Sequence, residues 1–287
     1  MAESLRQIKQ RIKSVNNTKK ITKAMEMVAA AKLKKYQDLL GQTRAYGAQL
    51  ERMLRQLIGA TPDFRHPFFE VREPKNNLVF LIASDSGLCG SYNYNLFQTA
   101  ERFLREQQIA NSFFSIGRQG LGFIKRRRFQ IVGDLSVPRP QEIQTTVKTI
   151  IERSSSLFIE GKFDRIYLIY TQFFSMGSYK PTVDLLLPLE PPKSTGEKKS
   201  EERYILEPSA EVILNQMIPS YLELKVEQAV KEALVSEQVS RMMAMRQATD
   251  NATEMIDALT LARNKARQAN ITKELIEIVS GSKAQKK

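Results

Sequence analysis

The sequence has very few of the residues that build catalytic and metal sites. Cys89 is the only cysteine, His66 is the only histidine, and tryptophan is absent. A single cysteine excludes an intramolecular disulfide and a cysteine metal cluster. A Ser-His-Asp triad or a histidine metal site would have to use His66, which lies in the turn-like context Arg65-His66-Pro67. We therefore expect a surface turn there, and predict no catalytic residue, no metal and no cofactor.

Long apolar runs are also missing. No stretch approaches 18 consecutive apolar residues, which is about the length that a membrane-spanning helix needs. The N-terminal residues lack the apolar core of a secretory signal and the Ser- and Arg-rich character of a transit peptide. We therefore expect an unprocessed chain that does not span a membrane.

Acidic residues are scarce at the N-terminal end. The net charge is +13, and residues 1–58 contain 13 Lys and Arg against four Asp and Glu, whereas residues 208–287 are nearly balanced. A basic segment of this kind suits nucleic acid, an anionic lipid surface or an acidic protein surface. Charge alone leaves these three classes of partner open.

Glycine and proline are absent between Ser220 and Ser280. Apolar or small residues recur there at steps of three and four, which is typical of one side of a long helix. They are Met242, Met245, Thr249, Ala252, Ile256, Leu259, Ala262 and Ala266. Such a helix is too long to be buried against a compact domain of this size, so the pattern predicts a partner helix or a partner protein.

Residues 3–58 are the natural partner helix. Apolar positions again follow steps of three and four, beginning at Leu5, Ile8, Ile12 and Val15 and continuing through Thr22, Met25, Val28 or Ala29, Leu33, Tyr36, Leu40, Leu50, Leu54 and Leu57. Because the chain must leave this helix and return, we expect the two terminal helices to form an antiparallel coiled coil.

The middle of the chain alternates between strand and helix patterns. Strands are predicted at 77–83, 111–116, 128–132, 165–171 and 183–187, the last as a hairpin with the fourth, and helices at 93–107, 119–127 and 140–160. This order predicts a three-layer, Rossmann-like α/β domain with a mostly parallel sheet. We expect domain boundaries at 1–58, 59–207 and 208–287, with a mobile loop at about 190–203.

The loop Asp85–Ser91 follows a predicted strand and precedes a helix, where doubly wound sheets often bind phosphates. It matches neither a dinucleotide fingerprint nor a P-loop, so a tight structural turn is favoured. Cys89 lacks a nearby histidine to act as its base. The basic runs Arg126–Arg128 and Lys198–Lys199 are typical of solvated faces. Nucleic-acid stacking platforms interleave aromatic residues with basic ones, and the basic helix from Arg6 to Lys35 has only Tyr36 nearby.

Three stretches resemble one family. They are Ile8–Ile12 with Thr18–Ala30, then Ser84–Asn93, and a C-terminal set formed by Ser236–Gln238, Arg241–Met245, Ala248–Ala252, Asn264–Ala269, Ile271–Thr272 and Glu274–Gly281. All three are similar to the gamma subunit of the rotary ATP synthase. The resemblance covers the whole chain. It departs from the family at Ser86, where arginine is usual.

The resemblance implies a central-stalk rotor. Its helices would stand inside a ring of three alpha and three beta subunits, and its α/β domain would bind the epsilon subunit and the c-subunit ring. Proton-driven rotation would then drive the catalytic beta subunits, and this chain would have no active site of its own. By motif match, Met25, Arg267, Gln268 and Thr272 would contact the beta subunits, and Tyr204 and Glu207 would contact the c ring or epsilon.

The same resemblance places the chain at the cytoplasmic face of a bacterial inner membrane, associated through the c ring and without nucleic acid. Chloroplast-type relatives carry a regulatory cysteine pair, which a chain with Cys89 alone lacks. Two other functions stay open from the residues alone. A basic coiled-coil nucleic-acid-binding protein predicts salt-dependent binding to DNA, and a nucleotide-dependent α/β enzyme predicts saturable nucleotide binding.

Overall fold

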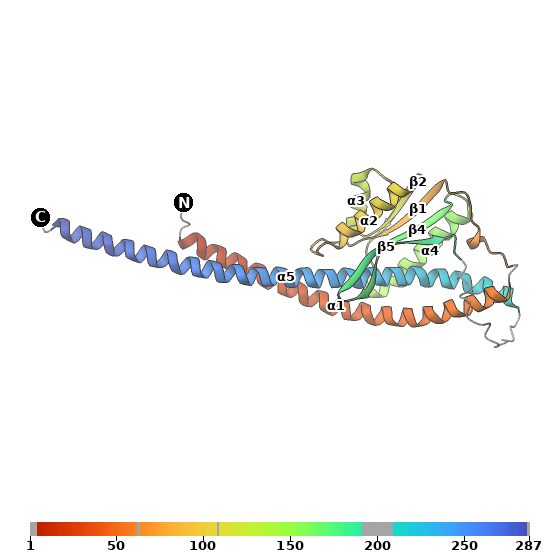
Figure 1. Cartoon of the computed structure of the whole chain (residues 1–287), viewed down its shortest axis with the longest axis horizontal. Helices are drawn as coiled ribbons and strands as arrows, with labels where there is room; N and C mark the ends of the chain where they lie inside the picture. The colour runs from red at the N-terminus through yellow and green to blue at the C-terminus, as the bar shows by residue number, and fades with distance from the viewer. Residues whose placement is uncertain (1–4, 62–63, 108, 191–208, 286–287) are drawn as a thin grey trace. The chain divides into compact units, whose positions relative to one another are not determined.

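The computed structural model describes residues 5–61, 64–107, 109–190 and 209–285. Two long helices, α1 (Leu5–Ala60) and α5 (Ala210–Gln285), flank a central sheet domain in the sequence (Figure 1). The elements between them are β1 (Asn76–Ile82), α2 (Tyr92–Glu106), β2 (Ala110–Ile116), α3 (Arg118–Arg127), β3 (Gln130–Leu135), α4 (Ile143–Ile159), β4 (Arg165–Ser175) and β5 (Ser178–Leu187). The predicted α/β class is confirmed.

The five strands form one sheet in the order β3-β2-β1-β4-β5. The first four are parallel, and β5 returns antiparallel beside β4 as the predicted hairpin. Helices α2 and α3 cover one face and α4 lies on the other (Figure 1). Right-handed crossovers require this, because the chain moves one way through β1, β2 and β3 and then back to β4. The predicted three layers are therefore present.

The core of the domain lies between the sheet and the helices α2 and α3. It is built from residues of β1, β2 and β4 that alternate along each strand, such as Val79, Leu81 and Phe113, and from Leu96 and Phe123 of the two helices. Six of the seven residues of β1 are buried. A strand buried on both faces needs apolar residues throughout, which is why the apolar run of β1 could be predicted as a strand from the sequence.

Some element boundaries differ from the prediction. Arg128 does not start a strand: it takes a left-handed conformation at φ 58° and its N–H bonds the Ile124 and Lys125 carbonyls, so it closes α3. Helix α5 begins at Ala210 and passes through Pro219. Proline removes one helical hydrogen bond, and the burial of Leu214, Ile218 and Leu222 on both sides of it keeps the helix packed.

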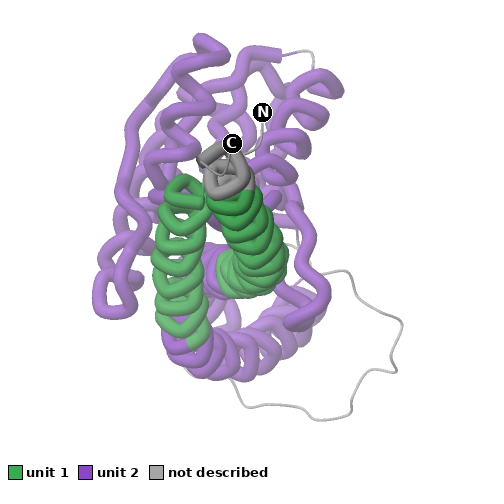
Figure 2. Tube along the Cα trace, turned by 90° about the vertical axis from the view of Figure 1, so that its left-hand side faces the viewer, with its two compact units in different colours: residues 1–30, 241–287 green, residues 31–240 purple. Residues whose placement is uncertain are grey.

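The described chain groups into two compact units, residues 1–30 with 241–287 and residues 31–240 (Figure 2). The division at 1–58, 59–207 and 208–287 stays a proposal about the sequence. The loop expected at about 190–203 lies, apart from residue 190, outside the described residues.

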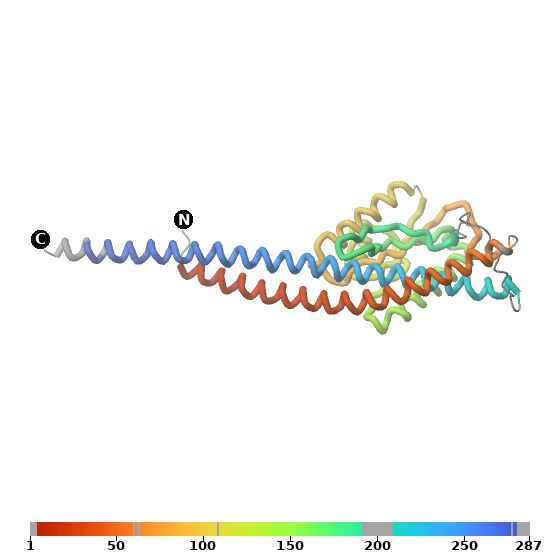
Figure 3. Tube along the Cα trace, turned by 60° about the horizontal axis from the view of Figure 1, so that its bottom comes forward, coloured from red at the N-terminus to blue at the C-terminus, as the bar shows by residue number. Residues whose placement is uncertain are grey.

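In the first unit, the start of α1 runs beside residues 241–266 of α5 in the opposite direction (Figure 3). The hydroxyl oxygens of Thr22 and Thr249 lie 2.8 Å apart, and both side chains are buried. Most of the predicted stripe lies at least partly buried, with Met245 and Ala252 fully so; Ala262 is exposed. On α1 the buried alternative is Ala29 rather than Val28. A seam of Thr and Ala allows close approach of the two backbones.

In the second unit, residues 31–60 of α1 pack against residues 210–240 of α5. Gly47 lies beside Leu224, and the Lys231 ammonium donates to the Thr43 hydroxyl at 2.6 Å. The predicted apolar positions of this part of α1 are all buried, namely Leu33, Tyr36, Leu40, Leu50, Leu54 and Leu57. The antiparallel pairing predicted from the sequence therefore holds in each unit.

Candidate functional site

The loop after β1 is a tight structural turn. The Asn93 amide closes it, accepting from the Ser84 N–H and donating to the Ser84 hydroxyl at 2.7 Å. Asp85 accepts from the N–H groups of Arg118 and Val137, which ties the loop to α3 and to the segment after β3. Ser86, the position where the family usually has arginine, is exposed and uses its carbonyl in the turn.

The carboxyl end of the sheet is covered by α5. In doubly wound sheets, ligands bind at this end, where the strand order reverses, here between β1 and β4. Ser240 donates to the Cys89 carbonyl at 2.7 Å, Ser236 donates to the Thr171 carbonyl at 3.1 Å, and Tyr92 donates to the Ala233 carbonyl at 3.2 Å. A helix of the chain itself occupies the usual ligand position.

The lone histidine serves the turn predicted for it. His66 Nδ1 accepts from the Phe68 N–H at 3.1 Å and caps the short helix Pro67–Phe69. Burial lowers the pKa of the imidazole, which favours the neutral form that can accept this hydrogen bond. No three His, Cys, Asp or Glu side chains of the described residues come close enough to share a metal ion.

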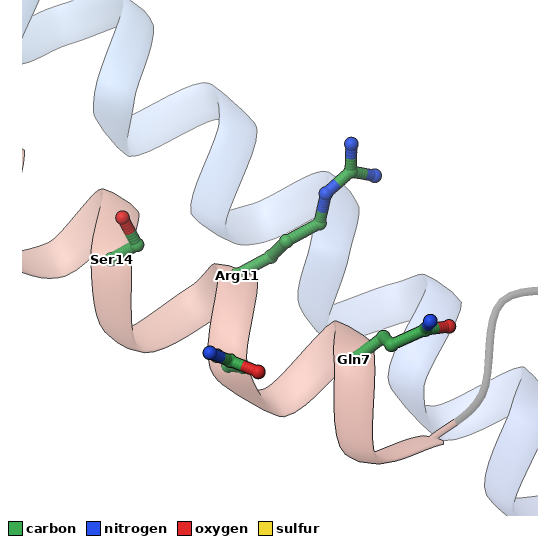
Figure 4. A pocket seen from close by; sticks show the side chains of 4 residues that line it. Gln7, Arg11 and Ser14 are labelled. Carbon is green, nitrogen blue, oxygen red and sulfur yellow. The ribbon is translucent and has the colours of Figure 1, made fainter.

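A hollow of about 410 Å³ lies along the start of α1 and is lined by Gln7, Gln10, Arg11 and Ser14 (Figure 4). All four side chains come from one helix. They offer amides, a guanidinium and a hydroxyl, with no carboxylate pair or activated nucleophile. This hollow therefore has the chemistry of a polar contact surface.

The structure places the predicted beta-contact residues in two positions within the first unit. Met25 is half-buried, whereas Arg267, Gln268 and Thr272 are exposed on α5, where the Thr272 hydroxyl donates to the Gln268 carbonyl at 2.9 Å. Met25 is displaced from Arg267 by roughly 30 Å along the helix pair, at 1.5 Å per residue. Tyr204 and Glu207 lie outside the described residues.

The end of α5 has no described helix beside it. Counted 17 residues from the Thr22–Thr249 pair, Leu5 of α1 lies opposite Ala266 of α5. Beyond that point the described side chains are exposed, including large apolar ones: Ile271, Leu275, Ile276, Ile278 and Val279. Exposed apolar groups gathered in this way mark an interaction surface.

The comparison with known proteins decides the family. A family model described as ATP synthase matches residues 4–284. The chain is 41% identical to the ATP synthase gamma chain of Pelotomaculum thermopropionicum over 98% of this chain and 99% of that one, and 42% identical to that of Moorella thermoacetica with the same coverage. The chain belongs to the ATP synthase gamma chain family. The family's proteins are parts of an enzyme complex.

Solved structures agree with this family at the level of the fold. A chain of the Euglena gracilis mitochondrial ATP synthase is similar with a TM-score of 0.71 at 21% identity, covering 98% of this chain and 94% of that one. A chain from the central stalk and c ring of the Tetrahymena thermophila mitochondrial enzyme has a TM-score of 0.60 at 26% identity, covering 79% and 99%. Among the described helices, none has the length and low charge needed to cross a bilayer.

Sequence reasoning missed the contacts that join the gamma-family α/β domain to its helices. Ser236 is named only within a family motif, Ser240 is not singled out, and no sequence pattern predicts the pair formed by Arg44 and Glu232 at 2.8 Å. Arg44 and Glu232 are 188 residues apart in the sequence, so no local sequence pattern predicts their pairing. The i, i+4 spacing of the two serines was the only available clue.

Proposed function

We propose that this chain is the central-stalk rotor subunit of an F-type ATP synthase. It would couple proton-driven rotation of the c ring to conformational cycling of the catalytic beta subunits. One observation carries the proposal: identity of 41–42% to bacterial ATP synthase gamma chains over nearly the whole of both chains. The coverage includes both terminal helices and the α/β domain, so every part of the rotor has a counterpart.

In this proposal the chain does no catalysis itself. The usual ligand position of the α/β domain is held by Ser236 and Ser240 of its own helix α5. Nucleotide chemistry would belong to the three beta subunits, alternating with three alpha subunits around one copy of this chain.

The exposed part of α5 beyond Ala266 suits a position inside such a ring. Arg267, Gln268 and Thr272, together with Met25, are proposed to contact the beta subunits. The surplus of positive charge in residues 1–58 would attract acidic beta-subunit loops over a long range without fixing one rotational position. Exposed apolar residues at the tip would be covered by the ring.

The α/β domain would lie at the membrane end of the stalk. Tyr204 and Glu207 are proposed to contact the c ring, with the epsilon subunit beside the domain. The chain would then be a peripheral protein at the cytoplasmic face of a bacterial inner membrane, held there by the c ring.

Reconstitution tests this function. Alpha and beta subunits are prepared separately and mixed with and without this chain, and ATP hydrolysis and complex composition are measured. We expect a stable complex with one copy for three alpha–beta pairs, and turnover that depends on it. If the chain neither joins the complex nor changes turnover, but binds duplex DNA or a nucleotide by itself, the proposed function is wrong.

A further inference from the structure

A single guanidinium connects three elements of the second unit. Arg44 of α1 donates to Glu232 Oε1 of α5 through Nη2 at 2.8 Å and through Nε at 3.3 Å. Its Nη2 also donates to the Phe173 carbonyl of β4, and its charge lies 5.9 Å from the centre of the Phe173 ring. Both long helices and the sheet therefore meet at one side chain.

Glu232 depends on Arg44 for its charge balance. Its side chain is fully buried, and Oε2 has no hydrogen-bond donor among the described residues. Gln228 adds a neutral donor to Oε1 at 3.0 Å. The neighbouring Lys231 ammonium is engaged elsewhere, by Glu227 and Thr43. A buried carboxylate without its cation is strongly unfavourable, so Glu232 favours the alignment that places Arg44 beside it.

The apolar contacts between α1 and α5 fix the alignment of the two helices less sharply. Leu50, Leu54 and Leu57 follow one another at helical spacing on α1, and hydrophobic contact has no preferred direction. Sliding α5 by one turn would exchange one leucine contact for another of the same kind. The same slide would break the Arg44–Glu232 pair and leave its carboxylate buried.

We propose that Arg44 and Glu232, with the Phe173 carbonyl, form a register lock through which the α/β domain holds α1 and α5 when the rotor is under load. This inference rests on the proposed function, since only a rotor has to transmit torque from the domain to the helices. Arg44 and Glu232 are positioning residues: they act by keeping α1 and α5 in one alignment with each other and with β4 inside the second unit.

The test uses the assembled ATP synthase in inverted membrane vesicles. Arg44→Met keeps an unbranched apolar stem and removes the cation. We expect ATP-driven proton pumping per ATP hydrolysed to fall by about threefold or more, while ATP hydrolysis and subunit composition stay close to wild type. Arg55→Met, which removes an exposed pair with Glu51 on the same helix, is the matched control and should leave the ratio unchanged.

A double variant separates the proposed role in helix alignment from an effect on stability alone. Arg44→Met with Glu232→Leu replaces the buried pair by apolar groups of similar volume, which often restores stability. We expect its unfolding midpoint to recover while the pumping ratio stays low. Recovery of both quantities, or a normal ratio in Arg44→Met, would refute the register lock. Failure of the wild-type chain to support assembly would refute the proposed function instead.

Discussion

Polar side chains are buried along α5 between Lys231 and Ser240. The buried ones are Lys231, Glu232, Ser236, Glu237, Gln238 and Ser240. Several have partners on other elements, such as the hydroxyl of Thr43 and the carbonyls of Thr171 and Cys89. A buried polar group with a hydrogen-bond partner favours the one packing arrangement that keeps this bond. The position of this part of α5 is therefore fixed by directional hydrogen bonds as well as by the burial of apolar area.

Tyr221 gives a prediction about alkaline pH. Burial raises the pKa of its phenol to about 12, Glu51 adds to the shift and Arg55 opposes it. The unfolded chain ionises near the ordinary value of 10.0. The contribution of the Tyr221 phenol to the free energy of unfolding should therefore be constant below pH 10 and should be lost between pH 10 and about 12. For two pKa units the loss is about 2–3 kcal/mol.

The measurement is urea unfolding of the purified chain at several pH values. Tyr221→Phe should lose less stability between pH 9 and 12 than wild type. Part of the pH dependence will remain, because burial, and then Asp184, also raises the pKa of Tyr170. Tyr46→Phe, at a residue that is 59% exposed, should follow the wild-type curve. Identical curves for Tyr221→Phe and wild type would show that the Tyr221 phenol is not protected by burial.

Among the elements, the central strands were easier to predict than the edge strands. β1 and the first part of β4 are buried on both faces and are nearly continuous apolar runs. β3, at one edge, has no fully buried residue and alternates between half-buried and exposed positions. An edge strand needs fewer apolar residues because one of its sides is exposed to solvent. The sequence pattern therefore predicts the ends of β3 poorly.

Glycines in α1 give a prediction at this scale. A methyl group added at Gly41 would meet no atom within 4 Å, whereas at Gly47 it would lie 3.1 Å from Leu224 Cδ2. Alanine is favoured over glycine inside helices by about 0.5–1 kcal/mol. Gly41→Ala should therefore stabilise the chain by about that amount, and Gly47→Ala should gain less or be destabilising.

Urea unfolding at pH 7 measures both variants under the same conditions. The comparison reports on the seam, because helix propensity is the same at the two positions. Equal stabilisation by both substitutions would mean that α1 and α5 have room between them at Gly47, contrary to the packing described above.

At the scale of the whole molecule, the exposed end of α5 presents apolar side chains that a partner protein would bury. Arg267→Glu reverses one charge there, and in the proposed rotor it should lower coupled ATP synthesis by about threefold or more through repulsion from acidic beta-subunit surfaces. The measurement is ATP synthesis in energised vesicles. Arg102→Glu, on the exposed surface of α2, makes the same change of charge on the α/β domain and should have little effect. Unchanged synthesis and proton pumping in Arg267→Glu would remove Arg267 from the proposed contacts.

The fold could be predicted from the sequence to a large extent because its signals are local: helical stripes, buried strands and turns. The site could be predicted only by resemblance. Exposure of Arg267 and Thr272 is compatible with partner contact and does not identify the partner. The pairing of Arg44 with Glu232 could not be predicted from the sequence, since it depends on the packing of three elements that are far apart in sequence.

The helix that covers the carboxyl end of the sheet can also be viewed as a tethered ligand. Because Ser236 and Ser240 belong to the same chain as the sheet, α5 competes for that position at an effective concentration on the order of millimolar or above. A free nucleotide would have to displace the helix as well as bind. In the proposed rotor, the α/β domain would therefore respond to the force exerted by the subunits that it contacts rather than to the nucleotides around it.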